Sequence, residues 1–561
     1  MKSRNRIVII GGGACGPKAM ARARRSDPEA EITIIEQGSI VSQASCGLPY
    51  YVSGVIKRRG ALIVRTLESL KNIYAVNVLT GTRVENIERA EHRLDISSIG
   101  SGVNSTLEYD RLVLSTGSSP ILPRIEGVDL AGVYLLKDIA DADSILDAVA
   151  QGARRAVIIG AGLIGMEMTE AFIRCGLEVT LVDALDSVLP NVLDRDMSAI
   201  LARQLVLKGV RLKLGEKVVR FNGEGGRICQ VVTEKDTLNA DTVIMAVGVS
   251  PNTRLARQAG LKLGVTGAIA VNEYLQTSDP DIYAGGDCVE NTELIGKGKI
   301  YAPMGSTANR HGRVIGTNVT GGSETFPGVL GTVMLKAFDY NVGRTGMGEK
   351  QAQAAGFDVV TAITADPEHA TYYPGARDII IKLIADGKSR RILGGQVMGR
   401  GDVAKRIDVL VAALTLGGTI DMTSNMDFGY APPYNSALEP LQNASNIIRN
   451  KLSHLARGVA PAWVKDKLDA GEDFVLLDVR SRDEWNKWRI EGPQVKLLPL
   501  PSLRTNLGTL AQDKEIVVIC RRGVRAYQAQ RILDGAGFPD VQFVEGSLAA
   551  WPYDAFGGME D

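Results

Sequence analysis

The sequence has 561 residues, a length at which about four domains are expected. Hydrophobic residues make up 45% and charged residues 23% of the chain, which excludes a disordered protein. The 64 Lys and Arg residues balance the 64 Asp and Glu residues, so no global field would attract nucleic acid or an anionic membrane.

Three further features narrow the class of protein. No window approaches the 18 or more apolar residues of a membrane span, and the N-terminus has no secretory signal pattern. The six cysteines are scattered without a C-x-x-C pair, which argues against a disulfide framework and against a metal site. We therefore expect a cytoplasmic protein that binds neither nucleic acid, membrane nor metal.

The first predicted strand, at 6–12, runs into a glycine-rich turn and a helix. Gly11, Gly13 and Gly16 form the pattern G-x-G-x-x-G, and Glu36 ends the next predicted strand, at 31–36. The glycines allow a tight turn, close approach of backbone N–H groups to a diphosphate, and close packing of helix on strand. The helix N-terminus favours negative charge, and the acid accepts hydrogen bonds from ribose hydroxyls. This order predicts a dinucleotide site.

The same pattern returns about 150 residues later. Gly160, Gly162 and Gly165 follow a predicted strand that starts near Arg155, and Asp183 ends the strand at 178–183. An acid at that place accepts a 2′-hydroxyl and repels a 2′-phosphate, so we expect NADH to be preferred over NADPH. The chain therefore contains an internal repeat of a dinucleotide-binding fold.

Two dinucleotide sites in one chain point to the flavoprotein disulfide reductases, and three further segments resemble that family. They are the two crossover segments LSTGSSP (114–120) and AVGVSPN (246–252) and the second flavin motif DIYAGGDC (281–288). The resemblance covers residues 5–450. It implies an FAD-binding domain at 1–150 and 254–326 and an NAD(H)-binding domain at 151–253, both Rossmann-like. It also implies that Asp287 binds the ribityl chain and that cofactor contacts come from Ser42, Thr116, Gly117 and Gly248.

From about residue 327 the hydrophobic pattern changes. Four alternating segments are typical of an antiparallel sheet, namely GTVMLKAFD, DVVTAITA, DIIIKLIAD and RILGGQVMG. The resemblance identifies residues 327–451 as an α+β dimerisation domain, which implies a homodimer. A polar linker is expected near 452–461.

Residues 462–561 resemble a rhodanese, an α/β domain that carries sulfur as a persulfide. The matching segments are LLDVRSRDEW (476–485), EIVVICRRGVRAYQAQRIL (515–533) and VEGSLAAW (544–551). Backbone N–H groups of the loop around Cys520 would stabilise a thiolate or persulfide, and Arg521, Arg522 and Arg525 would add positive charge. Residues 489–501 depart from the family pattern, and a degraded rhodanese used only for docking remains an alternative.

Cys46 lies in the segment SQASCGLPYYVSG, which has no second cysteine. Most disulfide reductases carry C-x4-C beside the flavin, so a lone thiol must work through a mixed disulfide, a persulfide or a sulfenic acid. We expect Cys46 to begin a helix whose dipole lowers the thiol pKa. The segment resembles coenzyme A-disulfide reductases, while the turn GGGACG lacks the His that single-cysteine peroxidases and oxidases carry there.

Two tyrosine-containing segments, HATYYPGA (369–376) and FGYAPPYNSA (428–437), also resemble the coenzyme A-disulfide reductases. In that family two tyrosines of the partner subunit reach the active thiol, which implies that Tyr372 and Tyr430 act in trans and protonate a leaving thiolate. Coenzyme A is a further candidate ligand, with contacts implied at Arg22, Arg25, Lys71, Asn309 and Arg310. Ser45 and Leu438 stand where the family usually has Asn and Lys, which weakens the case for coenzyme A.

These features predict an FAD-dependent, NADH-driven reductase of a small sulfur substrate, namely a persulfide, a polysulfide or coenzyme A disulfide. Cys46 would carry out the reduction, and Cys520 would handle sulfane sulfur. Two alternatives stay open: an NADH oxidase that cycles Cys46 through sulfenic acid, and a flavin redox sensor or sulfur carrier without turnover. The sequence leaves open the physiological substrate and whether Cys520 delivers sulfur within one chain or between chains.

Overall fold

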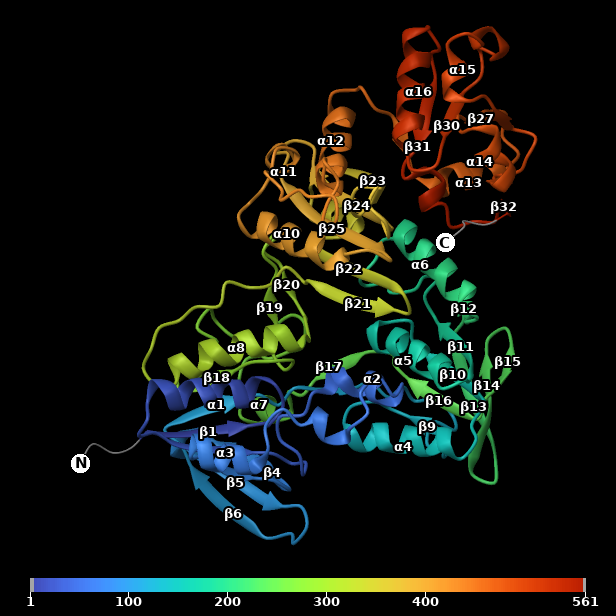
Figure 1. Cartoon of the computed structure of the whole chain (residues 1–561). Coiled ribbons are helices and arrows are strands. Elements are labelled where there is room, and N and C mark those ends of the chain that lie inside the picture. The colour runs from blue at the N-terminus through green and yellow to red at the C-terminus, as the bar shows by residue number, and fades with distance from the viewer. Residues whose placement is uncertain (1–4, 558–561) are drawn as a thin grey trace. The chain divides into compact units, whose positions relative to one another are not determined.

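A computed structural model describes residues 5–557, so the ends of the two terminal predicted domains, 1–4 and 558–561, lie outside the described part. The chain divides into two compact units, residues 1–184 with 216–329 and residues 185–215 with 330–561 (Figure 1). The predicted fold class is confirmed, with two parallel sheets in the first unit and an antiparallel and a parallel sheet in the second. In the part of the chain that the structure describes, no helix is long and apolar enough to cross a membrane.

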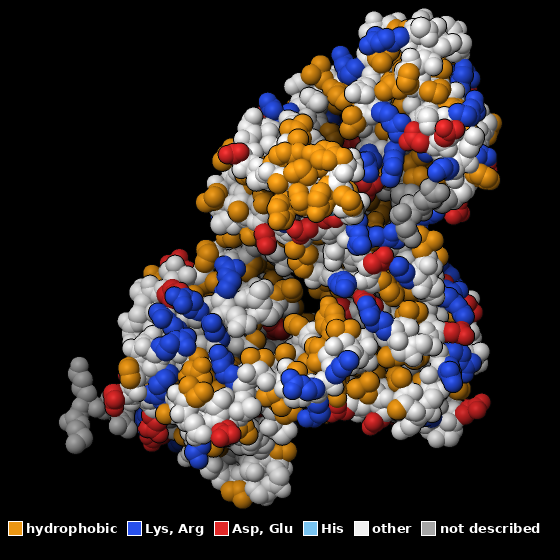
Figure 2. Space-filling view, in the orientation of Figure 1, with side chains coloured by type: hydrophobic (Ala, Val, Ile, Leu, Met, Phe, Trp, Pro, Cys, Tyr) orange, Lys and Arg blue, Asp and Glu red, His pale blue; other side chains and the backbone are white. Residues whose placement is uncertain are grey.

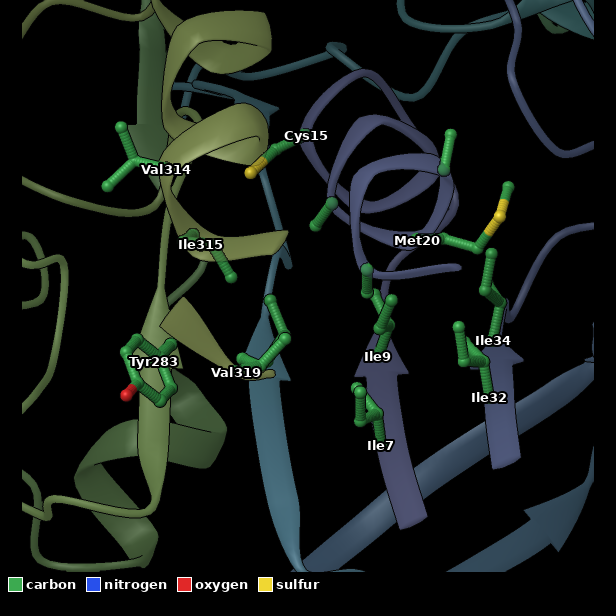
Figure 3. Packing of buried hydrophobic residues seen from close by; sticks show 14 of the residues in the cluster. Ile7, Ile9, Cys15, Met20, Ile32, Ile34, Tyr283, Val314, Ile315 and Val319 are labelled. Atoms are coloured by element: carbon green, nitrogen blue, oxygen red, sulfur yellow. The ribbon is translucent and has the colours of Figure 1, made fainter. Parts of the chain in front are cut away.

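The first unit contains a five-stranded parallel sheet in the order β18-β7-β1-β2-β3. Its strands are β1 (Arg6–Ile10), β2 (Glu31–Ile35), β3 (Asn77–Leu79), β7 (Arg111–Leu114) and β18 (Ile282–Ala284). Ile7 and Ile9 pack under the helices α1 (Cys15–Ser26) and α8 (Gly305–Asn318), as Figure 3 shows. Val8 and Ile10 belong to a second buried cluster on the other face. Because both faces are buried, residues 7–10 of β1 form a continuous apolar run.

This region also contains an antiparallel sheet and several short helical segments. The strands are β4 (Thr82–Glu88), β5 (Arg93–Ser98) and β6 (Asn104–Glu108). The helical segments are the 3-10 helix η1 (Ser45–Gly47) and the helices α2 (Leu48–Val52), α3 (Leu67–Tyr74) and α7 (Arg254–Gln258).

The predicted second repeat also folds as a parallel sheet, with neighbouring strands in the order β11-β10-β16-β9. They are β9 (Val133–Tyr134), β10 (Arg155–Ile159), β11 (Glu178–Asp183) and β16 (Thr242–Met245), with helices α4 (Ile139–Ala150) and α5 (Leu163–Arg174). A small antiparallel sheet joins β13 (Val218–Glu224), β14 (Arg227–Thr233) and β15 (Thr237–Asn239). The two predicted crossover segments pair with each other as the antiparallel strands β8 (Ser118–Pro120) and β17 (Val249–Pro251).

In the second unit, the alternating segments form an antiparallel sheet in the order β21-β22-β25-β24-β23. Its strands are β21 (Val333–Ala337), β22 (Tyr340–Gly346), β23 (Val359–Pro367), β24 (Asp378–Asp386) and β25 (Ile392–Gly399). The helices are α9 (Glu349–Ala354), α10 (Val403–Thr415), α11 (Ile420–Ser424) and α12 (Pro440–Leu452).

Helix α6 (Arg195–Leu207) and strand β12 (Arg211–Leu214) belong to the second unit, although the sequence prediction assigned their residues to the NAD(H)-binding domain. Lys382 of β24 explains this grouping. Its buried ammonium group contacts Asp194 and Asp196, at the start of α6, and Glu349 of α9. A buried lysine needs such partners, because an unpaired charge in the interior is costly.

The C-terminal region is a parallel sheet in the order β26-β31-β30-β27-β29. Its strands are β26 (Gly458–Val459), β27 (Val475–Asp478), β29 (Val495–Leu497), β30 (Ile516–Ile519) and β31 (Val541–Val544). Around it lie α13 (Pro461–Asp469), α14 (Arg482–Lys487), α15 (Leu500–Leu503), α16 (Val524–Gly535) and the 3-10 helix η5 (Ser547–Ala550). Side chains of β30 alternate between two buried clusters, so this strand is the centre of the domain.

Candidate active site

The first glycine-rich turn has the geometry of a phosphate cradle. Gly11 has φ +107°, and a Cβ there would lie 2.2 Å from the carbonyl oxygen of Ser115. A Cβ on Gly16 would lie 2.1 Å from the Gly11 carbonyl oxygen, whereas one on Gly13 would meet no atom within 4 Å. The open space therefore lies over the middle glycine, at the N-terminus of the twelve-residue helix α1. This arrangement fits the diphosphate of a dinucleotide.

The second turn reproduces these contacts. Gly160 has φ +106°, and its Cβ would lie 2.3 Å from the carbonyl oxygen of Ala246. A Cβ on Gly165 would lie 1.9 Å from the Gly160 carbonyl oxygen, whereas Gly162 again faces open space. The two turns therefore offer equivalent cradles, one for each predicted dinucleotide.

The two acidic residues at the strand ends also make equivalent contacts. Glu36 Oε2 accepts a hydrogen bond from the amide of Gly12 at 2.7 Å, and Asp183 Oδ2 accepts one from the amide of Ala161 at 2.6 Å. Each carboxylate is thus fixed beside its turn, at the place where a ribose would bind. Ser42 supports the first turn through its backbone, because its amide donates to the Gly12 carbonyl oxygen at 2.7 Å.

The crossover segments are tied together by a residue that the sequence analysis did not single out. Asn252 accepts a hydrogen bond at its carbonyl oxygen from Thr116 Oγ1 at 2.7 Å, and its side-chain amide donates to the Thr116 carbonyl oxygen at 2.9 Å. Gly117 and Gly248, at φ +67° and +111°, let the chain turn into these strands. Asp287 is held nearby by Ser118 Oγ at 3.2 Å, and burial raises the pKa of its carboxyl group.

Cys46 lies in the 3-10 helix η1, and its side chain is exposed. The thiol borders the first residue of α8, because a Cβ on Gly305 would lie 3.8 Å from Cys46 Sγ. The expectation of a lowered pKa is wrong. Partial burial raises the pKa of the Cys46 thiol, and the negative charges of Glu167 and Asp287 raise it further. The expected dipole also has little helix behind it, since α2 has only five residues.

Glu167 and Tyr50 form a pair beside this thiol that the sequence analysis missed. Glu167 follows the second glycine-rich turn in α5, and its carboxylate accepts a hydrogen bond from Tyr50 of α2. Burial raises the pKa of Glu167 to about 7, and the neighbouring charge of Glu170 acts in the same direction. The only sequence signal was the position of Glu167 two residues after the turn.

The predicted cations occupy α1, α3 and α8. Arg22 Nε donates to Thr317 Oγ1 at 2.9 Å, which fixes one residue of α1 against α8. The Asn309 side chain donates to the Gly305 carbonyl oxygen at 2.8 Å, and the Arg310 guanidinium lies 4.7 Å from the ring centre of Phe326. Arg25 and Lys71 are exposed. Asn309 and Arg310 thus stand about one helical turn from the residue that borders Cys46.

In the second unit, the structure brings together the two predicted tyrosines. The hydroxyl oxygens of Tyr372 and Tyr430 are 2.7 Å apart, and this hydrogen bond raises the pKa of Tyr372. Both side chains are largely exposed, at 74% and 51%. Figure 2 shows hydrophobic side chains gathered over the part of this unit where α10, α11 and α12 lie. Exposed apolar and aromatic residues in this part of the chain include Tyr373, Leu416, Met422, Tyr434 and Leu438.

Cys520 has a different environment, at the end of β30 and just before α16. Its side chain is buried, and Sγ accepts a hydrogen bond from the amide of Gly523 at 3.1 Å. Ser547 Oγ lies 3.5 Å from Sγ and accepts a hydrogen bond from the Cys520 amide at 3.2 Å. The loop therefore directs a backbone donor at the sulfur, as the sequence predicted.

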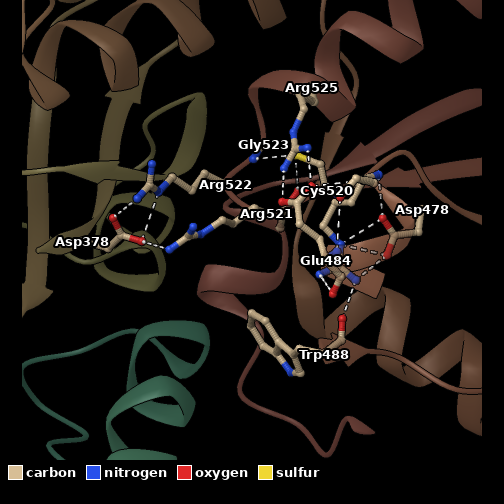
Figure 4. A network of polar contacts seen from close by, with 12 residues as sticks. Asp378, Asp478, Glu484, Trp488, Cys520, Arg521, Arg522, Gly523 and Arg525 are labelled. Atoms are coloured by element: carbon tan, nitrogen blue, oxygen red, sulfur yellow. Dashed lines mark hydrogen bonds and ion pairs between the residues drawn. The ribbon is translucent and has the colours of Figure 1, made fainter. Parts of the chain in front are cut away.

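The three arginines of this loop are less available than expected (Figure 4). Arg525 makes two hydrogen bonds to Glu484, at 2.7 and 2.6 Å, which lower the pKa of that carboxyl to about 2. Arg522 pairs with Asp378 of β24, with Nη2 2.6 Å from Oδ1. Arg521 remains about half exposed, 4.0 Å from Asp378. Carboxylates thus offset much of the positive charge that the sequence analysis expected.

Comparisons with known proteins match every region of the chain. Residues 5–302 match the family described as pyridine nucleotide-disulphide oxidoreductase, residues 334–441 its dimerisation domain, and residues 460–553 a rhodanese-like domain. The chain is 36% identical to the NAD(P)H coenzyme A polysulfide/persulfide reductase of Pyrococcus horikoshii, over 80% of this chain and 99% of that protein. It is 34% identical to the NADH oxidase of Enterococcus faecalis, over 76% of this chain and 96% of that protein.

A solved structure extends the similarity to the C-terminal region. The NAD-dependent persulfide reductase from A. fulgidus is 43% identical and superposes with a TM-score of 0.93. It covers 97% of this chain and 100% of its own, a share that includes the rhodanese-like region. The similarity therefore extends over all three of the matched regions of this chain.

Proposed function

The chain belongs to the pyridine nucleotide-disulphide oxidoreductase family and ends in a rhodanese-like domain, and on this basis we propose that it uses NADH and FAD to reduce persulfide, polysulfide or coenzyme A-disulfide bonds. The observation that carries the proposal is the exposed thiol of Cys46. Besides partial burial, the charges of Glu167, beside the second glycine-rich turn, and of Asp287, in the second flavin motif, raise the pKa of this thiol. A lone thiol between two dinucleotide cradles suits the transfer of an electron pair to an external sulfur.

The two cradles would hold the cofactors. Gly11, Gly13, Gly16 and Glu36 would bind the adenosine diphosphate part of FAD, and Asp287 its ribityl chain. Gly160, Gly162, Gly165 and Asp183 would bind NADH, and the Asp183 carboxylate disfavours the extra phosphate of NADPH. The flavin, when bound, would carry the electron pair of NADH to the sulfur held at Cys46.

Cys46 would perform the sulfur chemistry as a thiolate. It attacks one sulfur of the substrate disulfide or persulfide, a Cys46–S bond forms, the substrate S–S bond breaks, and a thiolate or hydrosulfide leaves. Tyr372 and Tyr430 of a partner subunit would protonate that leaving group, since both hydroxyls are exposed and already share a hydrogen bond. The matched dimerisation domain and the exposed aromatic face support a homodimer whose site is completed in trans.

Four basic residues and one asparagine favour coenzyme A as the carrier. The phosphates of coenzyme A would bind Arg22, Arg25, Lys71, Asn309 and Arg310, which occupy helices α1, α3 and α8. Cys520 would accept sulfane sulfur as a persulfide, stabilised by the Gly523 amide, and supply it for reduction at Cys46.

The similarity to an NADH oxidase keeps oxygen reduction as a second candidate. In that case Cys46 would pass through a sulfenic acid. The absence of His from the turn GGGACG argues against peroxide handling at this site.

Steady-state NADH oxidation over a panel of substrates tests the proposal. Coenzyme A persulfide, polysulfide and coenzyme A disulfide should each support turnover well above the rate with oxygen alone. Cys46→Ser should lower these rates at least about 1000-fold with FAD retained, because the nucleophile is lost. Cys520→Ala should keep coenzyme A-disulfide reduction and lose transfer from thiosulfate. An active Cys46→Ser variant, or equal rates with oxygen alone, would contradict the proposal.

A further inference from the structure

The site around Cys520 is built partly by another domain. The loop that contains Cys520 contacts β24 through Arg522, whose Nε lies 3.0 Å from Asp378 Oδ2 and whose Nη2 lies 2.6 Å from Oδ1. The segment before η5 contacts β23, because buried Glu545 accepts a hydrogen bond from the amide of Ile363 at 2.9 Å. The loop that contains Cys520 and the segment before η5 are therefore both held by contacts to the antiparallel sheet.

The contact between Glu545 and β23 affects the surroundings of the Cys520 thiol. Glu545 also forms an ion pair with Lys451 of α12, at 2.5 Å. Two residues further on, Ser547 holds the Cys520 amide and lies 3.5 Å from its Sγ. Attachment to the sheet therefore positions one of the groups that face the sulfur.

The contact between Asp378 and Arg522 reduces the positive charge of the loop that contains Cys520. A guanidinium held in a two-point pair has its charge offset and two of its donors occupied. Arg525 has its carboxylate partner, Glu484, in its own domain, but Arg522 takes Asp378 from the dimerisation domain. Figure 4 shows the Asp378–Arg522 pair. Each of the two side chains is about one-quarter exposed, which leaves the pair open to an entering anion.

We infer that Asp378 is a specificity-determining residue of the rhodanese site, which competes with anionic sulfur donors for Arg522. This inference rests on the proposed sulfur transfer at Cys520. With thiosulfate, the Cys520 thiolate attacks the outer sulfur, the S–S bond breaks, and sulfite leaves with the bonding pair. Cyanide then removes the outer sulfur of the persulfide as thiocyanate and restores the thiolate. The dianion must approach the arginines, and Asp378 opposes its approach.

Thiosulfate–cyanide sulfur transfer by the FAD-loaded, full-length protein tests the inference. Asp378→Asn should lower KM for thiosulfate about three- to tenfold, with a smaller change in kcat, because Arg522 is released for the anion. Asp378→Glu keeps the charge and should resemble the wild type. In an Arg522→Gln background, adding Asp378→Asn should lower KM much less than it does in the wild type, since the arginine that pairs most closely with Asp378 is absent and only Arg521, 4.0 Å away, remains.

Asp421→Asn is a matched control, because this carboxylate also pairs with two arginines, Arg390 and Arg449, of its own domain. An unchanged KM in Asp378→Asn would overturn the inference. A raised KM or a collapsed kcat would overturn it too, because Asp378 would then only hold the loop in shape. Thermal unfolding of each variant separates this second outcome from misfolding. If the wild type transfers no sulfur, the proposed role of Cys520 fails instead, and the inference falls with it.

Discussion

The two reactive thiols differ in what surrounds them. Cys46 is exposed, but partial burial of its thiol, followed by negative charge from Glu167 and Asp287, raises its pKa. Cys520 is buried and receives a backbone donor from Gly523. The first environment suits a thiol that other groups must activate when substrate and cofactors assemble around it. The second suits a thiol whose surroundings are already in place within the chain to hold a sulfur anion.

Variants of Tyr372 and Tyr430 test this difference between Cys46 and Cys520, and their expected effect is the largest. Tyr372→Phe and Tyr430→Phe should each lower kcat for NADH-driven reduction about 100-fold, because the leaving thiolate loses its proton donor. The same variants should leave thiosulfate–cyanide transfer at Cys520 unchanged. Both rates can be measured on one preparation of each variant.

Tyr434→Phe serves as the control, because Tyr434 lies four residues after Tyr430 and is also exposed, at 73%. Mixing Cys46→Ser protomers with Tyr372→Phe/Tyr430→Phe protomers tests action in trans. One active site of each mixed dimer should regain both the thiol and the tyrosines. Full activity in the tyrosine variants would contradict the view that Cys46 needs groups of a partner subunit.

Ser547→Ala should have a moderate effect on the other thiol. Loss of its hydroxyl removes an acceptor from the Cys520 amide and a polar group from the sulfur, and a hydrogen bond of this kind contributes about 1 kcal/mol. We expect thiosulfate–cyanide transfer to fall about five- to tenfold, while coenzyme A-disulfide reduction stays constant.

Ser502→Ala, in α15 of the same domain, is a suitable control for Ser547→Ala. Equal loss of both activities in Ser547→Ala would show that the two thiols are not independent.

The sequence predicted the parts of these sites that depend on local backbone geometry. The glycines of both turns and the strand-end acids Glu36 and Asp183 lie where the spacing placed them, because a strand–turn–helix fixes their relative positions. Asn252, Asp378 and Glu167 were missed, because their partners lie 136, 144 and 117 residues away in the chain and come into contact only through tertiary packing.

The pKa of Cys46 was predicted in the wrong direction for a related reason. A short helix after a cysteine suggests thiolate stabilisation, but burial by tertiary packing and then the charges of Glu167 and Asp287 raise the thiol pKa instead. A local rule for a helix dipole takes no account of carboxylates that distant segments bring to the same thiol.

The Glu167→Gln variant tests whether the charge of Glu167 raises the Cys46 pKa, and we expect its effect to be the smallest. Above pH 7 the Glu167 carboxylate is mostly ionised, and its charge disfavours the Cys46 thiolate. The variant lacks this charge, so its thiol pKa is lower and alkylation by iodoacetamide should be about two- to threefold faster at pH 8. At pH 6 wild-type Glu167 is mostly protonated, and the two proteins should react alike. Peptide mass spectrometry assigns the modified cysteine.

Asp143→Asn provides the matched control, because Asp143 accepts a hydrogen bond from Tyr51 at 3.1 Å, one residue after Tyr50 in α2. It should leave the pH dependence unchanged, since Asp143 is not among the charges that raise the Cys46 pKa. Equal acceleration at pH 6 and pH 8 in Glu167→Gln would point to altered access rather than to charge. A difference that develops between those pH values ties the reactivity of Cys46 to the Glu167 carboxylate of α5.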